Sequence, residues 1–215
     1  MISELKKRLA SVLWIGGATD SGKSTVAKNL SLRFGVPVYQ YDKADAEQTE
    51  KIAGIVPEVD RFLKASMEER WVHSTPQMML DFLLLVFPHR FQLVIEDLLE
   101  MPGNQAVIVE GFGLVPELVH PVLSSPHQAV WFVPTDKFKL DSMIRRGKPS
   151  FASLLGDPEK ARKNLFDRDG MLADYYRRQV QSHGYILYEV DGSRSAEEMT
   201  DLVASHFSEH LATLA

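Results

Sequence analysis

The fold of this chain is decided by the stretch GATDSGKS, residues 17–24, which matches the pattern G-x-x-x-x-G-K-[ST] at every fixed position. An apolar run, residues 12–16, precedes this stretch, and an amphipathic segment, residues 23–34, follows it. A strand, a glycine-rich loop and a helix in this order form the context in which the pattern holds phosphate groups. The stretch therefore predicts a phosphate-binding loop at the end of a buried strand.

The residue types in this loop suit phosphate chemistry. Glycines let the backbone curl so that successive N–H groups point at phosphate oxygens, and the following helix adds its positive N-terminal end. We expect Lys23 to reach the β- and γ-phosphates of ATP, Ser24 to ligate Mg²⁺ and Thr25 to reach the α-phosphate. The alternative is a glycine-rich turn with an incidental lysine. The expected nucleotide-binding residues of the loop are Gly17, Ala18, Thr19, Asp20, Ser21, Gly22, Lys23, Ser24 and Thr25.

Short apolar runs alternate with amphipathic segments, which predicts an α/β fold with a parallel sheet covered by helices. Near-continuous apolar runs suit strands that are buried on both faces. The expected strands are residues 12–16, 37–41, 105–110, 128–133 and 185–190. The expected helices are residues 23–34, 135–146, 158–183, as one long helix or two broken ones, and 195–211.

Residues 45–102 separate the second and third expected strands with far more chain than a crossover requires. Helical patterns cover residues 67–73, 76–87 and 91–100. We interpret residues 45–102 as a helical insertion that covers the sheet and a substrate, within a single domain that spans residues 1–215. Some of its aromatic side chains are expected in the core, and others could line an acceptor pocket: Trp71, His73, Phe82, Phe87 and Phe91.

Two acidic residues follow expected strands, at the edge of the sheet where ligands bind in parallel α/β folds. Glu110 ends the third strand and would act on Mg²⁺, through water, or on the attacking group; alternatively it merely ends the strand. Asp42 follows the second strand and could accept a proton from an acceptor hydroxyl, cap a helix, or do both. Asp45 lies one turn further on and could share a face with Asp42.

Arginines cluster after the fourth expected strand, and phosphoryl transfer needs cations on the moving group. The cluster consists of Arg145, Arg146, Arg162, Arg168, Arg177 and Arg178. Residues 145–169 carry glycines and prolines at their edges, which suits a lid that opens and closes. We expect Arg146 and Arg168 to stabilise the phosphoryl group, with a solvated helix face as the alternative. After the last strand, the loop that contains Gly192 could lie under the nucleotide base or form a plain turn.

The composition excludes several classes of protein. The 215 residues contain no cysteine, which excludes a disulfide scaffold, a thiolate metal site and a cysteine nucleophile. The seven histidines have no metal-ligand spacing, so we expect no zinc site. Lys and Arg number 24 against 29 Asp and Glu, and the net charge of −5 argues against general binding to nucleic acid or anionic lipid.

The same reasoning predicts no membrane partner. The longest apolar run, residues 78–87, contains Asp81 and stops at Pro88, which makes it too short to span a membrane. The N-terminal residues have no signal-peptide pattern, and a chain without cysteine suits the reducing cytoplasm, which is the expected location. The sequence carries no signal for an oligomeric state.

With the phosphate loop, five strands and an arginine-bearing lid, the chain resembles the P-loop kinases of the nucleoside-monophosphate-kinase-like group. That group includes adenylate, cytidylate, shikimate and gluconate kinases and the chloramphenicol phosphotransferases. The resemblance implies a three-layer α/β/α fold with strand order 2-3-1-4-5, and in-line transfer of the γ-phosphoryl group of ATP with Mg²⁺. Lys23 and Ser24 carry over directly. Asp42 falls where shikimate- and gluconate-type enzymes hold an acid, and Arg146 and Arg168 fall where the lid arginines lie.

The chain departs from this group after the third strand. Nucleoside monophosphate kinases often have Asp-Gly-x-Pro-Arg there, whereas this chain has Glu110-Gly111-Phe112-Gly113. The difference disfavours a nucleotide acceptor and favours a small hydroxylated metabolite or drug. The Val-Glu-Gly string at 109–111 also resembles uridine-kinase-like enzymes, which keeps a nucleoside among the candidates.

The leading hypothesis is an ATP-dependent small-molecule kinase, with Lys23, Asp42, Arg146 and Arg168 as catalytic residues. The second is a nucleotide-binding regulator or slow NTPase whose insertion contacts a protein partner, although the Asn-Lys-x-Asp string of GTP specificity is absent. A deep polar cleft facing Lys23 would favour the kinase, and an exposed apolar patch would favour the regulator. A third hypothesis, action on nucleic-acid ends, has the acidic charge balance against it.

Overall fold

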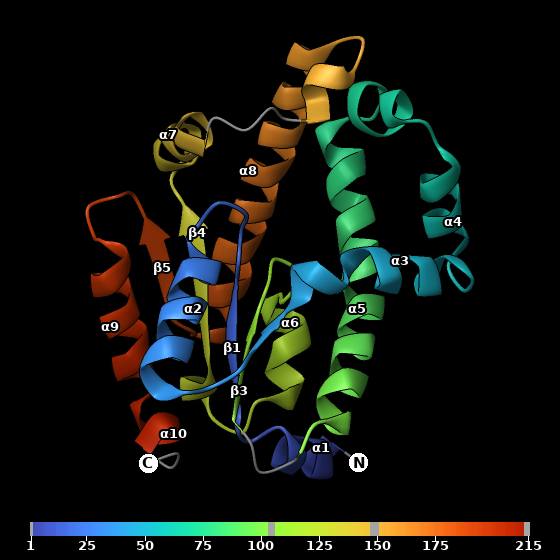
Figure 1. The fold of residues 1–215 in the computed structure, drawn as a ribbon. Helices are drawn as coiled ribbons and strands as arrows, with labels where there is room; N and C mark the ends of the chain where they lie inside the picture. Colours follow the sequence, from blue (N-terminus) through green and yellow to red (C-terminus); the bar gives the residue numbers. More distant parts are fainter. Residues whose placement is uncertain (1, 103–105, 147–150, 213–215) are drawn as a thin grey trace.

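The structure is a computed structural model that describes residues 2–102, 106–146 and 151–212. Its five strands form one parallel sheet in the order β2-β3-β1-β4-β5, which confirms the expected topology (Figure 1). The strands are β1 Val12–Gly17, β2 Val38–Gln40, β3 Val107–Glu110, β4 Ala129–Pro134 and β5 Leu187–Val190. Each strand begins and ends within two residues of its expected range, and Gln105, the expected start of the third strand, lies outside the described residues.

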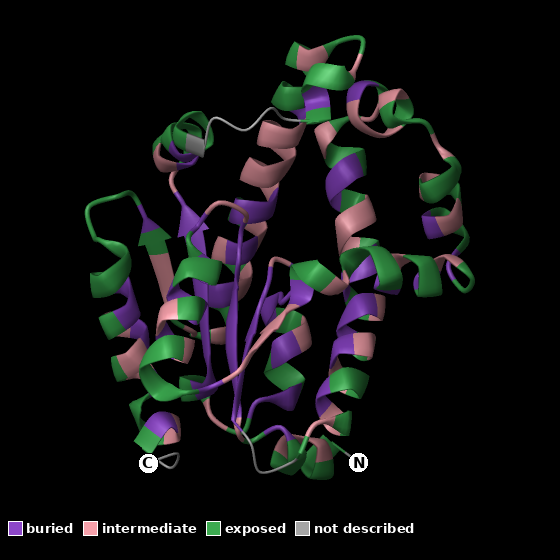
Figure 2. Ribbon diagram, in the orientation of Figure 1, coloured by how far each residue is buried: buried purple, intermediate pink, exposed green. Residues whose placement is uncertain are grey.

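Alternate residues of the central strands face two different layers of helices. On β1, Trp14 packs in a core shared with α5 (Pro76–Glu100) and α8 (Pro158–His183). Its neighbours Leu13 and Ile15 pack in a second core shared with α2 (Lys23–Phe34) and α9 (Ala196–His206). Every residue of β1, β3 and β4 is buried (Figure 2). The near-continuous apolar runs thus produce a three-layer fold.

The insertion between β2 and β3 is helical, as expected, but its divisions differ from the prediction. It contains η1 Tyr41–Ala44, α3 Asp45–Ala53, α4 Pro57–Lys64, the π-helix η2 Glu69–His73, and α5. The expected break in α5 is wrong, because the helix continues through Pro88. Proline removes one backbone hydrogen bond there, and the core packing of Phe87, Phe91 and Val94 on either side outweighs that loss.

This continuity also corrects the expectation that no apolar segment is long enough for a membrane. By length and composition alone α5 could cross one, since an 18-residue window reaches a mean hydropathy of 1.5. The apolar run in the sequence stops at Pro88, but the helix does not end there. In the structure α5 is packed as a core helix, with Phe91, Val94 and Leu98 buried beside β1 and β3.

The remaining helices complete the two layers. The long segment 158–183 forms the single unbroken helix α8. The expected helix 195–211 is instead divided into α9 and α10 at Phe207, whose fully buried ring lies in the α2–α9 core and whose backbone leaves the helical conformation. The other helical segments are α1 Ile2–Arg8, α6 Pro116–Val119, η3 His120–Val122, η4 Pro126–Gln128, α7 Asp136–Arg146, η5 Phe151–Leu154 and α10 Ser208–Leu211.

The helices α5 and α8 are longer than the strands of the sheet. The upper parts of α5 and α8 extend past the carboxyl ends of the strands, where η2 and η5 join them (Figure 1). Val72 of η2 and Ala152 of η5 pack with Ala161 of α8 in a small separate core. This arrangement leaves the phosphate loop facing the insertion and α8.

Candidate active site

The loop between β1 and α2 has the backbone that its glycines predict. Gly17 has a φ of 126° and Gly22 a φ of 83°, both in the region that favours glycine. A Cβ atom on Gly17 would lie 2.0 Å from the carbonyl oxygen of Phe132, so β4 passes where a side chain would be. Because α2 begins at Lys23, directly after Gly22, its N-terminus lies at the loop.

Lys23 lies beneath this loop and is almost completely buried, with 6% of its surface exposed. Its Nζ donates to the carbonyl oxygen of Ala18 at 2.6 Å and to Ser21 Oγ at 3.4 Å. Burial lowers the pKa of Lys23, and the negative charges of Asp42 and Glu110 oppose that shift. The ammonium group is therefore held inside the loop in a site that added negative charge would stabilise.

Ser24 and Glu110 meet beside the loop. Ser24 Oγ donates to Glu110 Oε2 at 3.1 Å, and Glu110 ends β3 next to Ile15 of β1. Burial raises the pKa of Glu110, while Lys23 lowers it. A hydroxyl and a carboxylate side by side are ligands that Mg²⁺ accepts, its remaining positions being filled by phosphate oxygens and water. Among the described residues no cluster of three or more His, Asp or Glu side chains forms another metal site.

Asp42 lies in η1, immediately after β2, and faces the loop. Burial raises the pKa of its carboxyl group, while the charge of Lys23 and a hydrogen bond from the Phe112 backbone lower it. Helix capping does not account for Asp42, because Gln40 precedes η1 and Ala44 precedes α3 at the capping positions. A carboxylate with a raised pKa beside the phosphate loop is suited to accept a proton.

Arg90, which sequence reasoning missed, organises the turn that carries Asp42. Its side chain is 1% exposed and donates from Nη1 to Asp45 Oδ1 at 2.5 Å, from Nη2 to the Tyr41 carbonyl oxygen at 2.7 Å and from Nε to Gln48 Oε1 at 3.2 Å. Its guanidinium also lies 3.8 Å from the centre of the Tyr41 ring. Asp45 is therefore paired with Arg90 instead of acting with Asp42. No motif marks Arg90 in the sequence.

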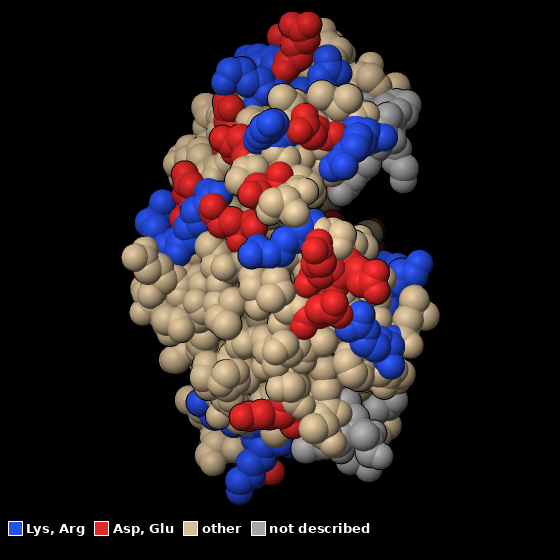
Figure 3. All heavy atoms as spheres, turned by 90° about the vertical axis from the view of Figure 1, so that its left-hand side faces the viewer, with Lys and Arg blue, Asp and Glu red and all other residues tan. Residues whose placement is uncertain are grey.

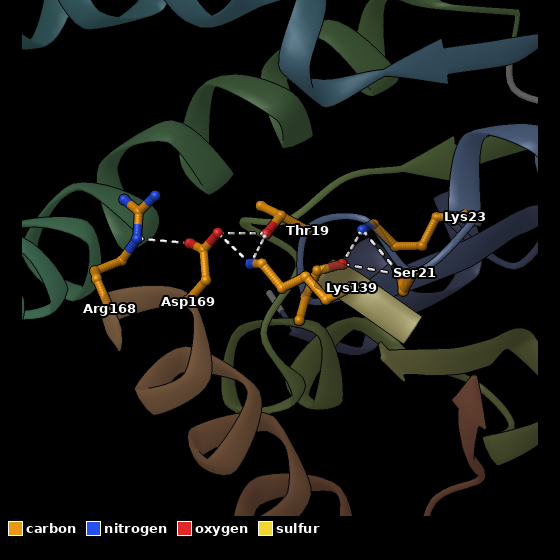
Figure 4. A network of polar contacts seen from close by, with 7 residues as sticks. Thr19, Ser21, Lys23, Lys139, Arg168 and Asp169 are labelled. Carbon is orange, nitrogen blue, oxygen red and sulfur yellow. Dashed lines mark hydrogen bonds and ion pairs between the residues drawn. The ribbon is translucent and has the colours of Figure 1, made fainter. Parts of the chain in front are cut away.

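A second missed feature is a buried network that links the loop to α7 and α8 (Figure 4). Thr19 Oγ1 donates to Asp169 Oδ2 at 2.8 Å, and Lys139 donates to Thr19 Oγ1 at 3.1 Å and also to Asp169. Arg168 Nε completes the network with an ion pair to Asp169 Oδ1 at 2.6 Å. Burial alone would raise the pKa of Asp169, but Arg168 and Lys139 outweigh it and the net shift is downward. The sequence gives little indication of this network, because Lys139 and Asp169 are 30 residues apart in the chain.

The arginine cluster separates into different environments. Arg168 is 13% exposed at its side chain, ion-paired through Nε, and lies beside the loop. Arg177 is committed to Asp174 and Glu189 at 2.8 and 2.7 Å, as expected of a helix-surface residue. The side chain of Arg146 and residues 147–150 of the expected lid lie outside the described residues. Arg145, Arg162 and Arg178 are exposed.

A cavity of about 460 Å³ opens between the loop and the insertion. Thr19, Arg168 and Phe112 line the end near the loop, and side chains of α3, α4, η2 and α5 line the rest. Of the five side chains proposed for an acceptor pocket, Trp71, Phe82 and Phe87 line this cavity. His73 does not, and Phe91 is buried in the core.

A smaller cavity of about 210 Å³ lies on the other side of the loop. Asp20, Gly22 and Thr25 of the loop, Phe138 of α7 and Arg194 after β5 are among its lining residues. Gly192 has a φ of 88°, and a Cβ there would lie 3.1 Å from the Phe138 ring. The expected base-binding loop thus borders a cavity that adjoins the expected phosphate site.

Comparisons with known proteins add fold-level similarity. No family model and no curated protein matches the chain. Similar solved structures include a shikimate kinase from Aquifex aeolicus (18% identity, TM-score 0.43, covering 94% of this chain and 98% of that chain). A gluconokinase from Sinorhizobium meliloti 1021 is 14% identical with a TM-score of 0.47, covering 95% of each chain. A shikimate kinase from Bacteroides thetaiotaomicron is 14% identical with a TM-score of 0.49, covering 92% of this chain and 98% of that chain. The chain is similar to these solved kinases of the shikimate and gluconate type.

Proposed function

We propose that this chain is an ATP-dependent kinase that transfers the γ-phosphoryl group to a hydroxyl group of a small molecule. The observation that carries the proposal is the geometry around Lys23. A buried lysine lies under a glycine-rich loop, Asp42 faces it from η1, and Arg168 borders a cavity that begins at Thr19 of the same loop. This set contains a phosphate site, a base, a cation and space for an acceptor.

In the proposed reaction the loop N–H groups and Lys23 hold the phosphates of ATP. The adenine ring of ATP lies in the neighbouring cavity of about 210 Å³. The acceptor oxygen forms a bond to the γ-phosphorus while the bond from that phosphorus to the bridging oxygen of ADP breaks. The bridging oxygen keeps the electron pair, and Asp42 takes the proton of the acceptor hydroxyl. Arg168, and Arg146 at the end of α7, are the proposed cations for the moving phosphoryl group.

The residues beside the loop fit a Mg²⁺ ion. Ser24 and Glu110 place a hydroxyl and a carboxylate in contact, and Glu110 is 2% exposed. They would hold the ion together with phosphate oxygens and water. When bound, Mg²⁺ neutralises charge on the β- and γ-phosphates.

A nucleotide-binding regulator or slow NTPase is the second candidate. Exposed apolar side chains on α7, Leu140 at 51% and Ile144 at 69%, favour it, because such residues often contact a partner. The cavity beside Thr19 is mostly apolar and Lys23 does not line it, so it differs from the polar cleft facing Lys23 that we expected of a kinase. It supports the kinase through its position, since a regulator needs no acceptor space next to its phosphate loop. The two candidates differ in product: the kinase yields a phosphorylated acceptor, and the NTPase yields phosphate.

The test is phosphoryl transfer from γ-labelled ATP with Mg²⁺ to a panel of alcohols. We expect the label to appear in an acceptor, with one ADP formed for each labelled product. In Lys23→Ala we expect kcat to fall about a hundredfold or more, which is the scale for removing a group that stabilises developing charge. Lys28→Ala, an exposed lysine on the same helix, is the matched control and should keep full activity. Full transfer by Lys23→Ala would falsify the mechanism, and release of phosphate with no labelled acceptor would favour the NTPase.

A further inference from the structure

The cavity beside the phosphate loop has walls whose chemistry is unlike that of a sugar or polyol site. Beyond Thr19 and Arg168 most of its lining side chains are apolar, and its volume is about 460 Å³. The polar members of the rest of the wall are Asp45, Thr49, Glu50, Arg70 and Arg90. A polyol that filled the space would also bury hydroxyl groups against the apolar remainder, which is costly, whereas an apolar body would gain from leaving water. The aromatic members of the wall are Phe62, Trp71, Phe82, Phe87 and Phe112.

These aromatic rings hold one another in place. Phe62 and Phe82 are stacked, with ring centres 4.1 Å apart and 20° between their planes. Trp71 meets Phe62 edge-on, at 5.9 Å and 90°. Asn164 of α8 anchors the segment that carries Trp71, because its Nδ2 donates to the carbonyl oxygens of Trp71 and Ser74 at 3.2 and 3.1 Å. The wall is therefore a preformed aromatic surface rather than a loose group of side chains.

Arg90 in the cavity wall is fully engaged with the protein, whereas Arg70 is engaged only in part, because its buried Nε has no hydrogen-bond partner among the described residues. All three nitrogens of the Arg90 guanidinium donate to Asp45, Tyr41 and Gln48. Arg70 donates to the carbonyl oxygen of Leu63 and lies 4.8 Å from the centre of the Phe62 ring. A carboxylate of a sugar acid would have to displace protein contacts to pair with Arg90. Arg168, at the loop end, is the cation placed for the phosphoryl group instead.

Resting on the kinase function proposed above, we propose that the acceptor is an alcohol whose body is a planar aromatic or fused-ring system. Its hydroxyl lies at the end bordered by Thr19, Phe112 and Arg168, near Asp42, the proposed base, which accepts a hydrogen bond from the Phe112 backbone. Its ring packs against Phe62, Trp71 and Phe82. The transfer itself is the one described above, with one phosphorus–oxygen bond formed and one broken.

Binding measured by calorimetry separates this inference from the kinase proposal. In the presence of Mg²⁺ and a non-hydrolysable ATP analogue, the ringed probes are 2-phenylethanol, 2-(2-naphthyl)ethanol and 2-(indol-3-yl)ethanol. The polar probes are gluconate, shikimate and myo-inositol. We expect at least one ringed alcohol to bind about tenfold or more tightly than every polar probe, the difference that an added aromatic contact and its burial support.

Variants locate the bound ring. Phe82→Ala should weaken binding of the ringed alcohol about tenfold, on the same scale. Trp71→Phe, which keeps a ring, should weaken it less than Trp71→Ala does. Phe34→Ala is the matched control, since Phe34 is a half-exposed aromatic residue at the far end of α2 and outside the cavity. Melting temperatures establish that each variant is folded, and Phe82→Leu replaces Phe82→Ala if the latter is not.

The outcomes are distinct. The aromatic acceptor is overturned if any polar probe binds more tightly than all ringed alcohols. It is also overturned if Phe34→Ala weakens binding of the ringed alcohol as much as Phe82→Ala does. In both cases the kinase proposal stands as long as the chain binds the ATP analogue. Failure of the unaltered chain to bind the ATP analogue, titrated separately, overturns the kinase proposal itself and the inference that rests on it. Binding of a ringed alcohol that Phe82→Ala weakens and Phe34→Ala does not supports the inference.

Discussion

Lys23 and Asp42 lie close enough to interact electrostatically, and burial shifts the pKa of each in the direction that favours its neutral form. Each charge partly counteracts the shift of the other. The four phosphate-linked charges of ATP would favour the protonated lysine, because Coulomb attraction is strong in a site from which water is excluded. Under the proposed mechanism, nucleotide binding would keep Lys23 protonated and leave Asp42 as the proton acceptor.

This arrangement predicts an acid limb in the pH profile. A base works only when deprotonated, so activity is lost as the pH falls through the pKa of Asp42, which burial raises above its ordinary value of 3.8. We expect the acid limb of kcat/KM above pH 3.8, and Asp42→Asn should lower kcat by about 10²–10⁴-fold, the usual contribution of general base catalysis. The affinity for ATP should change far less.

The matched control for this measurement is Glu110→Gln, the other carboxylate with a raised pKa near the loop. It should keep the acid limb that Asp42 causes and alter the Mg²⁺ dependence instead. An acid limb that persists unchanged in Asp42→Asn, or equal losses of kcat and ATP affinity, would remove Asp42 from its assigned role.

Lys139 offers a second prediction at this scale. Its side chain is 5% exposed and that of Asp169 11%, so the pair is buried between the loop and α8. Lys139→Met leaves Asp169 with Arg168 as its remaining ion-pair partner. It should destabilise the fold, but by less than the roughly 3–5 kcal/mol of a buried charge left without any partner. Because the neighbouring cations hold the pKa of Asp169 below 3.8, its contribution is present above that pH and is lost as the pH falls through the folded-state pKa.

Chemical unfolding at neutral and acidic pH checks this prediction. Lys163→Met is the control, because Lys163 also pairs with an aspartate of α8, Asp167, but is 74% exposed and should leave the stability unchanged. A destabilisation of Lys139→Met no larger than that of Lys163→Met would show that the network does not hold the loop to α8.

At the scale of elements, the turn after β3 packs against Tyr41 so closely that its two glycines, Gly111 and Gly113, have no room for a side chain. A Cβ on Gly111 would lie 2.3 Å from the Tyr41 Cβ, and one on Gly113 would lie 2.1 Å from its Oη. Tyr41 is fully buried and precedes Asp42, so a displaced ring would move the proposed base. Gly113→Ala should cost about 1–3 kcal/mol of stability, as overpacking does, and lower kcat as well.

Gly54→Ala, at the end of α3, is the control for this change. Its nearest neighbour would be the Lys51 carbonyl oxygen at 3.7 Å, and its backbone is right-handed helical, so alanine should be neutral or slightly stabilising. Thermal unfolding and kcat are measured for both variants. If Gly113→Ala is as stable and active as Gly54→Ala, the close packing on Tyr41 does not position Asp42.

The helix boundaries show which features of the elements can be predicted from local sequence. The range 23–34 is predicted to the residue, because Gly22 and Gly35 bound an amphipathic segment, with left-handed glycines at both ends. The break at Pro88 is predicted wrongly, because a local rule about proline competes with the packing of residues from β1, β3 and α8 on the same helix. Phe207 interrupts the last helix for the same kind of reason.

At the scale of the whole molecule, the charge distribution gives no broad attraction for anions. Lys and Arg side chains are interspersed with Asp and Glu on the face drawn in Figure 3, and the net charge is −5. An anionic nucleotide must therefore be held by the local cations and N–H groups of the loop.

Nucleotide binding should accordingly stabilise the whole fold. At a concentration of ATP one hundred times its dissociation constant, the free energy of unfolding should rise by about 2.7 kcal/mol, since the ligand binds the folded state alone. Chelation of Mg²⁺ should reduce the gain, Lys23→Ala should abolish it, and Lys28→Ala should keep it. Thermal unfolding at several ATP concentrations measures the effect, and a melting temperature independent of ATP in the unaltered chain would contradict nucleotide binding.

Local patterns in the sequence were enough to predict the phosphate loop and the five strands: glycines at fixed spacing, near-continuous apolar runs, and helix-ending residues. The strand order was expected from the resemblance to P-loop kinases and not from a local pattern, and the structure has that order. The sequence also placed Asp42 and Glu110 at the carboxyl edge of the sheet, since each directly follows a strand. Only the tertiary structure decided that Lys139 and Asp169 meet Thr19, that Arg90 holds the Asp42 turn, and that the insertion forms an aromatic wall. Those contacts join residues far apart in the chain, and no local pattern specifies them, because they arise from how whole helices pack on the sheet.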